Sequence, residues 1–215
     1  MNDLTILYYT ANVENKSLEN KVKENILNVC DDLPIISISQ KPIEFGHNIC
    51  VEKHDNCYYN EFRQIQIGLK EVKTNYVIVT EADCLYPPDY FKFRPKELGH
   101  CYRYNNVWVH YTQFKGAPKF RQKGFSDCAQ IIDVNIWTAL INKALDEKLK
   151  WGTKRNIVIG AMPKARRKYI WSGDPIITFK TKKGVKSVTQ VRSDISPQYN
   201  LPYWGSAKDI REKYI

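Results

Sequence analysis

The chain has 215 residues, of which 43% are hydrophobic and 26% charged, so its composition excludes a disordered chain and suits one domain with its own core. No apolar run reaches the ~20 residues that a transmembrane helix needs, and the first residues lack the pattern of a secretory signal. We therefore expect a cytoplasmic protein without a membrane partner. The formal net charge of +10 is uneven, because residues 1–107 hold 12 Lys/Arg and 15 Asp/Glu whereas residues 108–215 hold 21 and 8. This asymmetry favours a polyanionic partner for the second half over a generally basic surface.

Residues 1–90 alternate between strand-like apolar runs and amphipathic helical patterns. The order predicts strands and helices in turn: a strand at 4–9, a helix after Ser17, strands at 35–38 and 49–51, a helix at 59–72 and a strand at 76–79. Pro87 and Pro88 are expected to end regular structure there. Strands that alternate with helices predict an α/β fold with a Rossmann-like, mostly parallel sheet, whose ligands bind beyond the carboxyl ends of its strands.

The second half has a different character. We expect a hairpin over Cys101–Tyr111 with its turn at Asn105-Asn106, and a basic loop over Gly116–Gly124. Asp133 is predicted to cap a helix. Short strands are predicted at 176–180 and 185–188, and the tail from Ser196, which contains prolines and aromatic residues, is predicted to be a lid or wrap more than a core element.

The six cysteines contain no C-x-x-C pair, and most lie in apolar or strand-like surroundings, so we interpret them as reduced core residues of a cytoplasmic protein: Cys30, Cys50, Cys57, Cys84, Cys101 and Cys128. His47, Cys50, His54 and Cys57 are close in sequence. Their spacing is not that of a zinc finger, which favours ordinary loop and core residues over a zinc site.

The sharpest local signal is the acidic pair Glu81 and Asp83, which follows the predicted strand at 76–79. Two carboxylates at such a strand end suit Mg²⁺ or Mn²⁺, which prefer oxygen ligands and complete their shell with phosphate oxygens. A cation there would neutralise charge on a diphosphate leaving group. The alternative is a solvated acidic turn, which is common for an acid-x-acid triplet.

Strand 76–79 followed by Glu81-Ala82-Asp83 resembles the metal-binding D-x-D element of glycosyltransferases with the A-type fold. Gln66-Ile67-Gly68-Leu69 is similar to the N-x-G-[LIV] helix segment of inverting family-two enzymes. The stretch from Asn48 to Pro87 also looks like small glycosyltransferases of phage and metagenomic origin, some of them associated with DNA hypermodification. The resemblance covers residues 4–140 and is clearest from 48 to 90.

The resemblance implies a single A-type glycosyltransferase domain over residues 1–215. Residues 1–100 would bind the nucleotide sugar, and residues 101–215 would form the acceptor-binding half with the C-terminal lid. The donor would be a UDP-sugar bound with Mn²⁺ or Mg²⁺. No obligate protein partner is evident, and a viral enzyme would work in the host cytoplasm.

Carried over to matching positions, the resemblance assigns roles to individual residues. The nucleoside would contact three residues after the first strand: Thr10, Ala11 and Asn12. Arg63 would approach the diphosphate, Asp83 would bind the metal, and Glu81 would bind ribose or metal. This chain departs from the pattern in two ways, because its first acid is Glu and residues 178–183 contain no His as a later metal ligand. A lysine in that region could partly replace the cation by pairing with phosphate.

Transfer with inversion needs a carboxylate that takes the proton of the acceptor hydroxyl. Asp127 is the first candidate for this base, because it follows the basic loop and precedes the acceptor-side helix, where the family usually keeps its base, and Asp174 is the second. A turn or helix cap is the competing interpretation of Asp127.

The basic half suggests DNA as the acceptor. Its cations fall in three runs: Lys115, Lys119, Arg121 and Lys123; Lys164, Arg166, Arg167 and Lys168; Lys180, Lys182, Lys183 and Lys186. The aromatic residues between them could stack on bases: Tyr111, Phe114, Phe120, Phe125, Tyr169 and Trp171. The favoured acceptor is a hydroxymethylated pyrimidine, whose hydroxyl we expect to be reached in a widened groove, in a single strand or on a flipped base. Three alternatives stay open: a glycan or protein acceptor, a metal-dependent nuclease, and a non-catalytic DNA-binding protein.

Overall fold

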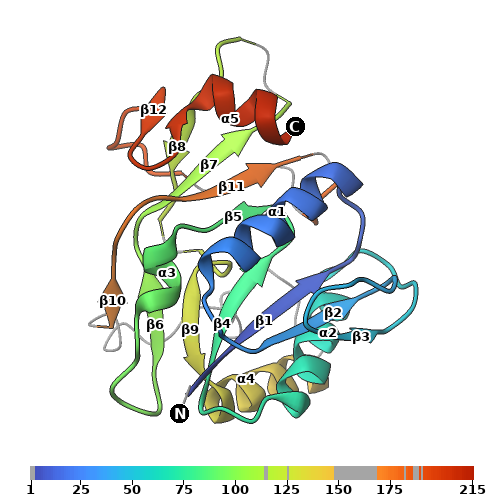
Figure 1. Ribbon diagram of the computed structural model, residues 1–215. Helices are drawn as coiled ribbons and strands as arrows, with labels where there is room; N and C mark the ends of the chain where they lie inside the picture. Colours follow the sequence, from blue (N-terminus) through green and yellow to red (C-terminus); the bar gives the residue numbers. More distant parts are fainter. Residues whose placement is uncertain are drawn as a thin grey trace.

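The computed structural model describes residues 3–113, 116–124, 126–147, 169–181, 183–185, 189 and 191–215. A seven-stranded sheet forms its centre, in the order β10-β6-β9-β4-β1-β2-β3 (Figure 1). These strands are β1 (Leu4–Thr10), β2 (Ile35–Ser39), β3 (His47–Cys50), β4 (Tyr76–Glu81), β6 (Cys101–Tyr104), β9 (Gln130–Asp133) and β10 (Ile170–Trp171). All of these strands run in one direction except β9, which is antiparallel to both β4 and β6. The α/β class and the mostly parallel sheet predicted from the sequence are thus confirmed.

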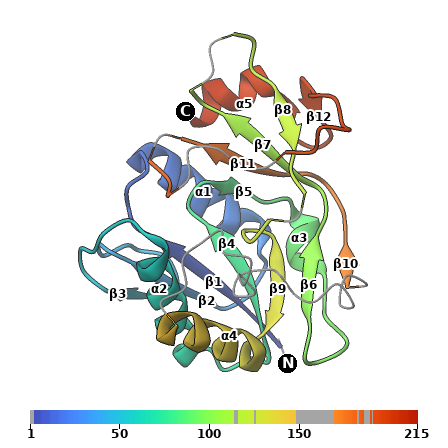
Figure 2. The same cartoon turned by 180° about the vertical axis from the view of Figure 1, so that it is seen from behind.

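A second, four-stranded sheet lies beyond the carboxyl end of β4, in the order β5-β11-β7-β8. It consists of β5 (Cys84–Leu85), β7 (Val107–Tyr111), β8 (Phe120–Gln122) and β11 (Ile176–Lys180). A small ribbon of β12 (Asn200–Leu201) and β13 (Gly205–Ser206) precedes the C-terminal helix. The N-terminus and the C-terminus lie at opposite ends of the molecule in both views (Figures 1 and 2).

Helices cover both faces of the large sheet. Helices α1 (Lys16–Val29) and α3 (Pro88–Lys92) lie on one face, α2 (Tyr58–Glu71) and α4 (Val134–Asp146) lie on the other, and α5 (Ala207–Tyr214) packs beside the smaller sheet (Figure 2). Strand β1 serves both faces because its side chains alternate. Ile6 and Tyr8 join the cluster that contains α1, whereas Leu7 and Tyr9 join the cluster that contains α2 and α4.

The close packing of α2 against the sheet depends on Gly68. A Cβ atom at this position would overlap Leu7 Cδ1 and lie 3.1 Å from Ile38 Cγ1. The Gly68→Ala variant should therefore lose about 1–3 kcal/mol of unfolding free energy, because overpacking a fitted core forces side chains and backbone to shift. Chemical denaturation monitored by circular dichroism measures this loss. Gly124→Ala is a matched control, since no heavy atom lies within 4 Å of a Cβ placed there, and equal stability of the two variants would contradict the prediction.

The predicted strands and helices of the first half are all present. One prediction there was wrong: Pro88 does not end regular structure but occupies the first turn of α3. A proline is tolerated in that position because the first amides of a helix have no partner within the helix.

The predicted hairpin over Cys101–Tyr111 was also wrong. Its two halves enter different sheets, since β6 pairs with β9 and β10 whereas β7 pairs with β8 and β11. The Asn106 side chain holds the link between them, because its Nδ2 donates to the Gly173 carbonyl (2.8 Å) and its Oδ1 accepts from Trp108 Nε1 (2.8 Å). Contacts with remote segments therefore override the local turn signal.

Three further predictions for the second half need correction or completion. The basic loop over Gly116–Gly124 contains strand β8. The tail is no simple lid, because it contributes buried side chains to the core: Leu201, Ala207, Ile210 and Tyr214. Of the predicted strand at 185–188, only Val185 lies within the described residues.

The predicted cap at Asp133 is confirmed, because its side chain accepts a hydrogen bond from the Ile136 amide at the start of α4. Within the described part of the chain, no helix combines the length and apolarity that crossing a membrane requires.

Candidate active site

A cleft of about 340 Å³ opens where β1 and β4 end. The two strands are parallel neighbours in which Tyr9 lies opposite Glu81, so the residues that follow them reach the same edge of the sheet. Thr10 and Ala11 line the cleft from β1, and Glu81 and Asp83 line it from β4 and its turn. The location is the one expected for a ligand site in a parallel α/β sheet.

The other walls come from segments far away in the sequence. The first turns of α2 contribute Glu61 and Gln64, and Gln64 Nε2 donates to the Thr10 carbonyl (2.9 Å), which ties the helix to the end of β1. The loop before β9 contributes Asp127 and Cys128, and Lys180 reaches the cleft from the end of β11. The cleft therefore joins the parallel half of the fold to the second sheet.

Glu81 is held from two sides. Its Oε1 accepts from the Tyr9 hydroxyl (3.1 Å), and its backbone amide donates to the Tyr86 hydroxyl (3.0 Å). The same Tyr86 hydroxyl donates to the Cys128 carbonyl (3.0 Å), so it fixes the end of β4 against the loop before β9. The backbone of Asp83 is fixed as well, because its carbonyl accepts from the Phe179 amide (2.7 Å).

Carboxylates dominate the charge of the cleft: Glu14, Asp55, Glu61, Glu81, Asp83 and Asp127. Burial, followed by the charges of Cys128 and Asp83, raises the pKa of Glu81 well above its usual range. Burial acts to lower the pKa of Lys180, but Asp83 and Glu81 outweigh it and the net direction is upward. A divalent cation would relieve the repulsion between the carboxylates, so the oxygen-rich donor set fits Mg²⁺ or Mn²⁺.

Asp127 is positioned by an ion pair. Its Oδ1 lies 3.3 Å from Arg103 Nη1, and the same guanidinium nitrogen donates to the Ser126 carbonyl (3.2 Å). The Asp127 side chain is 26% exposed, against 10% for Arg103, so the carboxylate is the partner that meets the cleft. A carboxylate held in this way can accept a proton from a bound hydroxyl group.

The structure separates the residues that the sequence assigned to one site. Five of these residues line the cleft: Thr10, Ala11, Glu81, Asp83 and Asp127.

Asn12, Arg63 and Asp174 are not among the lining residues. Asn12 has a left-handed backbone (φ 51°), and its Oδ1 accepts from the Lys41 amide (2.9 Å). Arg63 is exposed on α2. The backbone of Asp174 is bound elsewhere, with its carbonyl accepting from the Tyr104 hydroxyl (2.5 Å).

Glu61 and Lys180 were not assigned as site residues from the sequence. A signal for Glu61 was present, because a helix that crosses between parallel strands begins at the edge where a ligand binds, so its first-turn residues face that edge. For Lys180 the sequence contained a partial signal, because a lysine among residues 178–183 was expected to pair with phosphate, but it did not distinguish Lys180 from Lys182 and Lys183. Lys180 reaches the cleft because β11 pairs with β5, directly after the acidic turn.

The aromatic residues expected to stack on nucleic-acid bases are buried wherever the structure describes them: Tyr111, Phe120, Tyr169 and Trp171. That part of the interpretation was wrong for these four rings, since the second sheet and its surroundings use them as core. Lys123 is buried as well, and its Nζ donates to Ser126 Oγ (2.8 Å). The remaining rings and several of the cations lie outside the described residues: Phe114, Lys115, Phe125, Lys164, Arg166, Arg167, Lys168, Lys182 and Lys186.

Four of the cysteines are buried, as expected for core residues: Cys30, Cys84, Cys101 and Cys128. The expectation was wrong for Cys50, which is exposed, and Cys57 is half-buried.

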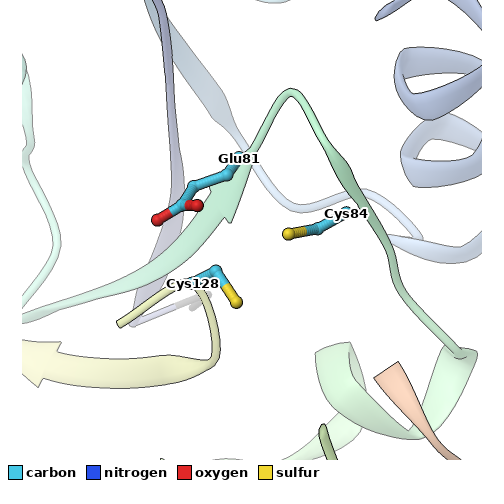
Figure 3. A group of neighbouring side chains, drawn as sticks. All are labelled: Glu81, Cys84 and Cys128. Atoms are coloured by element: carbon cyan, nitrogen blue, oxygen red, sulfur yellow. The ribbon is translucent and has the colours of Figure 1, made fainter. Parts of the chain in front are cut away.

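Two of the buried thiols meet the acidic turn. The ligand atoms of Glu81, Cys84 and Cys128 all lie within 4.8 Å of one another (Figure 3). Hydrogen bonding with Cys84 and the nearby Lys123 lower the pKa of Cys128 to about 7 against the effect of burial, whereas burial raises the pKa of Cys84.

Fold and cleft together define an α/β protein with an acidic cleft at the carboxyl edge of its parallel strands. No protein-family model and no curated protein sequence matches the chain.

Some solved structures are similar to it. Glycosyltransferase GlyE from Streptococcus pneumoniae TIGR4 has a TM-score of 0.42 and 12% identity over 79% of this chain and 45% of that chain. Its apo-form has the same two values over 71% and 40%. The bifunctional IspDF from Campylobacter jejuni has a TM-score of 0.41 and 11% identity over 67% and 44%. The chain spans less than half the length of each of these proteins, and likeness at this level assigns neither a family nor an activity.

Proposed function

We propose that the protein is an A-type glycosyltransferase that moves a sugar from a nucleotide sugar, a UDP-sugar, to an acceptor hydroxyl. The supporting observation is that one cleft at the ends of parallel strands holds both the acidic pair Glu81 and Asp83 and a separate, oriented carboxylate, Asp127. The fold alone does not select this activity, because α/β folds host many reactions. The two groups of carboxylates match the two tasks of glycosyl transfer: binding the donor diphosphate and deprotonating the acceptor.

The donor would lie along the strand ends. Its nucleoside would contact Thr10 and Ala11, and its diphosphate would face Glu81, Asp83 and the ammonium group of Lys180. A bound Mn²⁺ or Mg²⁺ would neutralise negative charge on the diphosphate as it leaves. Lys180 would supply a second positive charge from the end of β11, beside the acidic turn, and would compensate for the absence of histidine among residues 178–183.

Asp127 would act as the general base. It would take the proton from the acceptor hydroxyl while the oxygen of that hydroxyl forms a bond to the anomeric carbon, and the bond from that carbon to the diphosphate oxygen breaks. The nucleoside diphosphate would leave with the electron pair. Arg103 would keep the Asp127 carboxylate turned toward the cleft during this transfer.

The acceptor in this proposal is a hydroxymethylated pyrimidine in DNA. The charge of residues 108–215 supports it, since 21 Lys/Arg against 8 Asp/Glu would attract a phosphate backbone. The acidic cleft would repel that backbone, so only an extruded base could enter while basic surface outside the cleft holds the strand. Binding to DNA would then weaken steeply with salt.

A thermal-shift titration tests the donor site. UDP-sugar with Mn²⁺ should raise the melting temperature by several degrees, because a ligand at about 100 times its Kd stabilises the native state by about 2.7 kcal/mol. Omitting Mn²⁺ or adding a chelator should reduce the shift. A melting temperature that no nucleotide sugar changes, with or without Mn²⁺, would contradict a donor site in the cleft.

A transfer assay tests the acceptor. Radiolabelled UDP-sugars are incubated with hydroxymethylated DNA, with unmodified DNA of the same sequence and with a glycan mixture, and label should enter the hydroxymethylated DNA alone. Label in the glycans or in protein, and none in DNA, would contradict the DNA acceptor and support a glycan or protein acceptor. Nicking of plasmid with Mg²⁺, without any use of nucleotide sugar, would instead support the nuclease.

A further inference from the structure

The thiols of Cys84 and Cys128 come together beside Glu81 although the two cysteines are far apart in sequence. Cys84 lies on β5 directly after the acidic turn, and Cys128 lies in the loop before β9. Figure 3 shows their side chains and that of Glu81 extending from three different segments toward a common region. One ligand atom of each residue lies within 4.8 Å of the other two. Tyr86 locks this arrangement, because its hydroxyl bonds the backbone at both Glu81 and Cys128.

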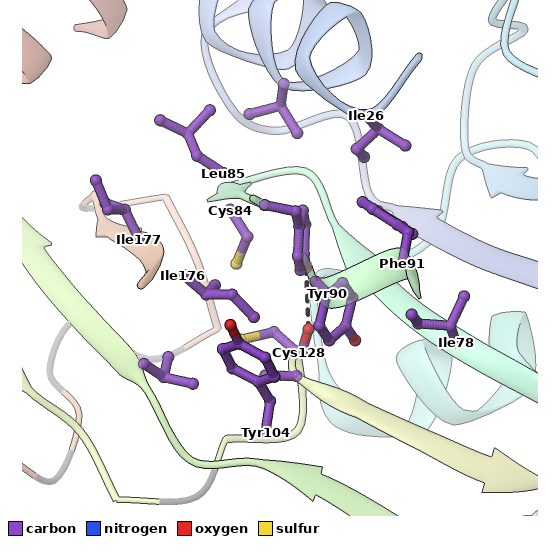
Figure 4. Packing of buried hydrophobic residues seen from close by; sticks show 14 of the residues in the cluster. Ile26, Ile78, Cys84, Leu85, Tyr90, Phe91, Tyr104, Cys128, Ile176 and Ile177 are labelled. Carbon is purple, nitrogen blue, oxygen red and sulfur yellow. Dashed lines mark hydrogen bonds between the residues drawn. The ribbon is translucent and has the colours of Figure 1, made fainter. Parts of the chain in front are cut away.

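The core side of this cluster is closed to water. Cys84 is 0% and Cys128 2% exposed, and Figure 4 shows both side chains within the cluster of buried residues that includes Ile176 and Tyr104. The other side is open, since Glu81 and Cys128 line the cleft whereas Cys84 lies behind them. A small ion could therefore arrive through the cleft.

The donor set has a distinct chemical preference. Two sulfur atoms and one carboxylate are poor ligands for Mg²⁺, which requires oxygen, but they suit a borderline-soft cation such as Zn²⁺. Three protein ligands leave one position of a tetrahedral shell for water or an incoming ligand. Two groups already bond these thiols: Asp83 Oδ1 accepts from Cys84 Sγ (3.3 Å), and Ser126 Oγ lies 3.1 Å from Cys128 Sγ. Such outer contacts orient metal ligands.

We propose that Glu81, Cys84 and Cys128 bind one thiophilic divalent cation such as Zn²⁺, with one coordination position open to the cleft. Binding replaces the protons of both thiols, which pass to solvent, and no oxidation is involved. The site shares Glu81 with the proposed donor site. It does not depend on sugar transfer, because its occupancy is measured in the protein without a donor.

Cobalt titration of the reduced, metal-free protein tests the site. Co²⁺ should produce a sulfur-to-metal charge-transfer absorption that saturates at one equivalent, disappears when Zn²⁺ is added and persists in excess Mg²⁺. Cys84→Ser and Cys128→Ser should each weaken Co²⁺ binding more than about tenfold and reduce the band. Cys101→Ser is the matched control, because Cys101 is equally buried but lies on β6 outside the cluster, and it should keep the full absorption.

Asp83→Ala distinguishes this site from the proposed donor site. It removes a carboxylate that is not one of the three ligands but accepts a hydrogen bond from Cys84 Sγ, so Co²⁺ should bind more weakly, yet the band should reach full intensity at saturating Co²⁺ even if sugar transfer is lost. Failure of every transfer assay would leave the cobalt result unaffected. Failure of the cobalt titration would likewise leave the result of the transfer assays unaffected.

A second measurement on the unmodified chain keeps the proposal testable if a serine variant does not fold. Zn²⁺ should protect Cys84 and Cys128, but not the exposed Cys50, from alkylation in the reduced protein, as mapped by mass spectrometry of peptides. Absence of the charge-transfer band in the reduced protein, or its full retention in both serine variants, would overturn the proposal. Alkylation of Cys84 and Cys128 at the same rate with and without Zn²⁺ would also overturn it. A Cys84–Cys128 disulfide in aerated protein, combined with no cobalt band after reduction, would identify a redox pair instead.

Discussion

Asp83→Ala should abolish glycosyl transfer, with a loss in turnover of about 10²-fold or more, because it removes a carboxylate that would hold the cation neutralising the donor diphosphate. The fold should survive. Within the described residues, the Asp83 side chain accepts one hydrogen bond, from the Cys84 thiol, and the backbone carbonyl keeps its bond from the Phe179 amide. The change in unfolding free energy should thus stay within about 1 kcal/mol. Transfer rates at saturating UDP-sugar and Mn²⁺, together with a denaturation curve, measure both quantities.

Asp89→Ala provides the control for this variant. Asp89 is also an aspartate close after β4, but it lies on α3 and is not a lining residue of the cleft, so its replacement should leave transfer near the wild-type rate. Wild-type transfer by Asp83→Ala would remove the proposed role of the acidic turn. Equal losses in the two variants would indicate general damage in place of a missing ligand for the donor.

Asp127→Asn should reduce turnover by about 10²–10⁴-fold, the usual contribution of a general base. Its effect on donor affinity should be small, because Asn has the same shape as Asp and the proposed donor contacts lie on the strand-end wall. The Arg103 guanidinium loses its charged partner but keeps its hydrogen bond to the Ser126 carbonyl. Steady-state kinetics should therefore show a reduced kcat with a nearly unchanged KM for the nucleotide sugar.

Asp174→Asn is the decisive companion to that experiment. Asp174 was the second candidate for the base, but it does not line the cleft, and its carbonyl accepts from the Tyr104 hydroxyl. We expect normal turnover from this variant. Unchanged turnover in Asp127→Asn together with a large loss in Asp174→Asn would reverse the assignment and place the acceptor at a different part of the surface.

The charge distribution of the sequence suggests a basic surface in the second half, but two lysines of that half, Lys123 and Lys180, lie at the acidic cleft. The basic half does not simply form a surface for a polyanion, since Lys123 is buried and Lys180 points its charge into an acidic cleft. Inside the cleft, these two lysines balance part of a carboxylate cluster that would otherwise be strongly repulsive. Any attraction of DNA must come from the other cations of residues 108–215.

Local patterns were sufficient for the first half of the fold. The apolar run at β1 and the amphipathic stripes of α1 and α2 depend on residues adjacent in sequence, and their order predicts parallel strands. The same reasoning placed Glu81 and Asp83 at a ligand-binding edge together with Thr10 and Ala11, because parallel neighbours end on the same side of a sheet. The acidic turn could therefore be predicted without knowledge of the second half.

The other side of the cleft was decided by pairing between remote segments. Strand β9 runs against its neighbours and so brings Asp127 and Cys128 to the end of β4, and the pairing of β11 with β5 brings Lys180 to the same place. Sheet order depends on the total packing of many side chains, which no short stretch of sequence contains. For this reason a cysteine that the sequence describes only as a core residue becomes, in the folded chain, a neighbour of the acidic turn.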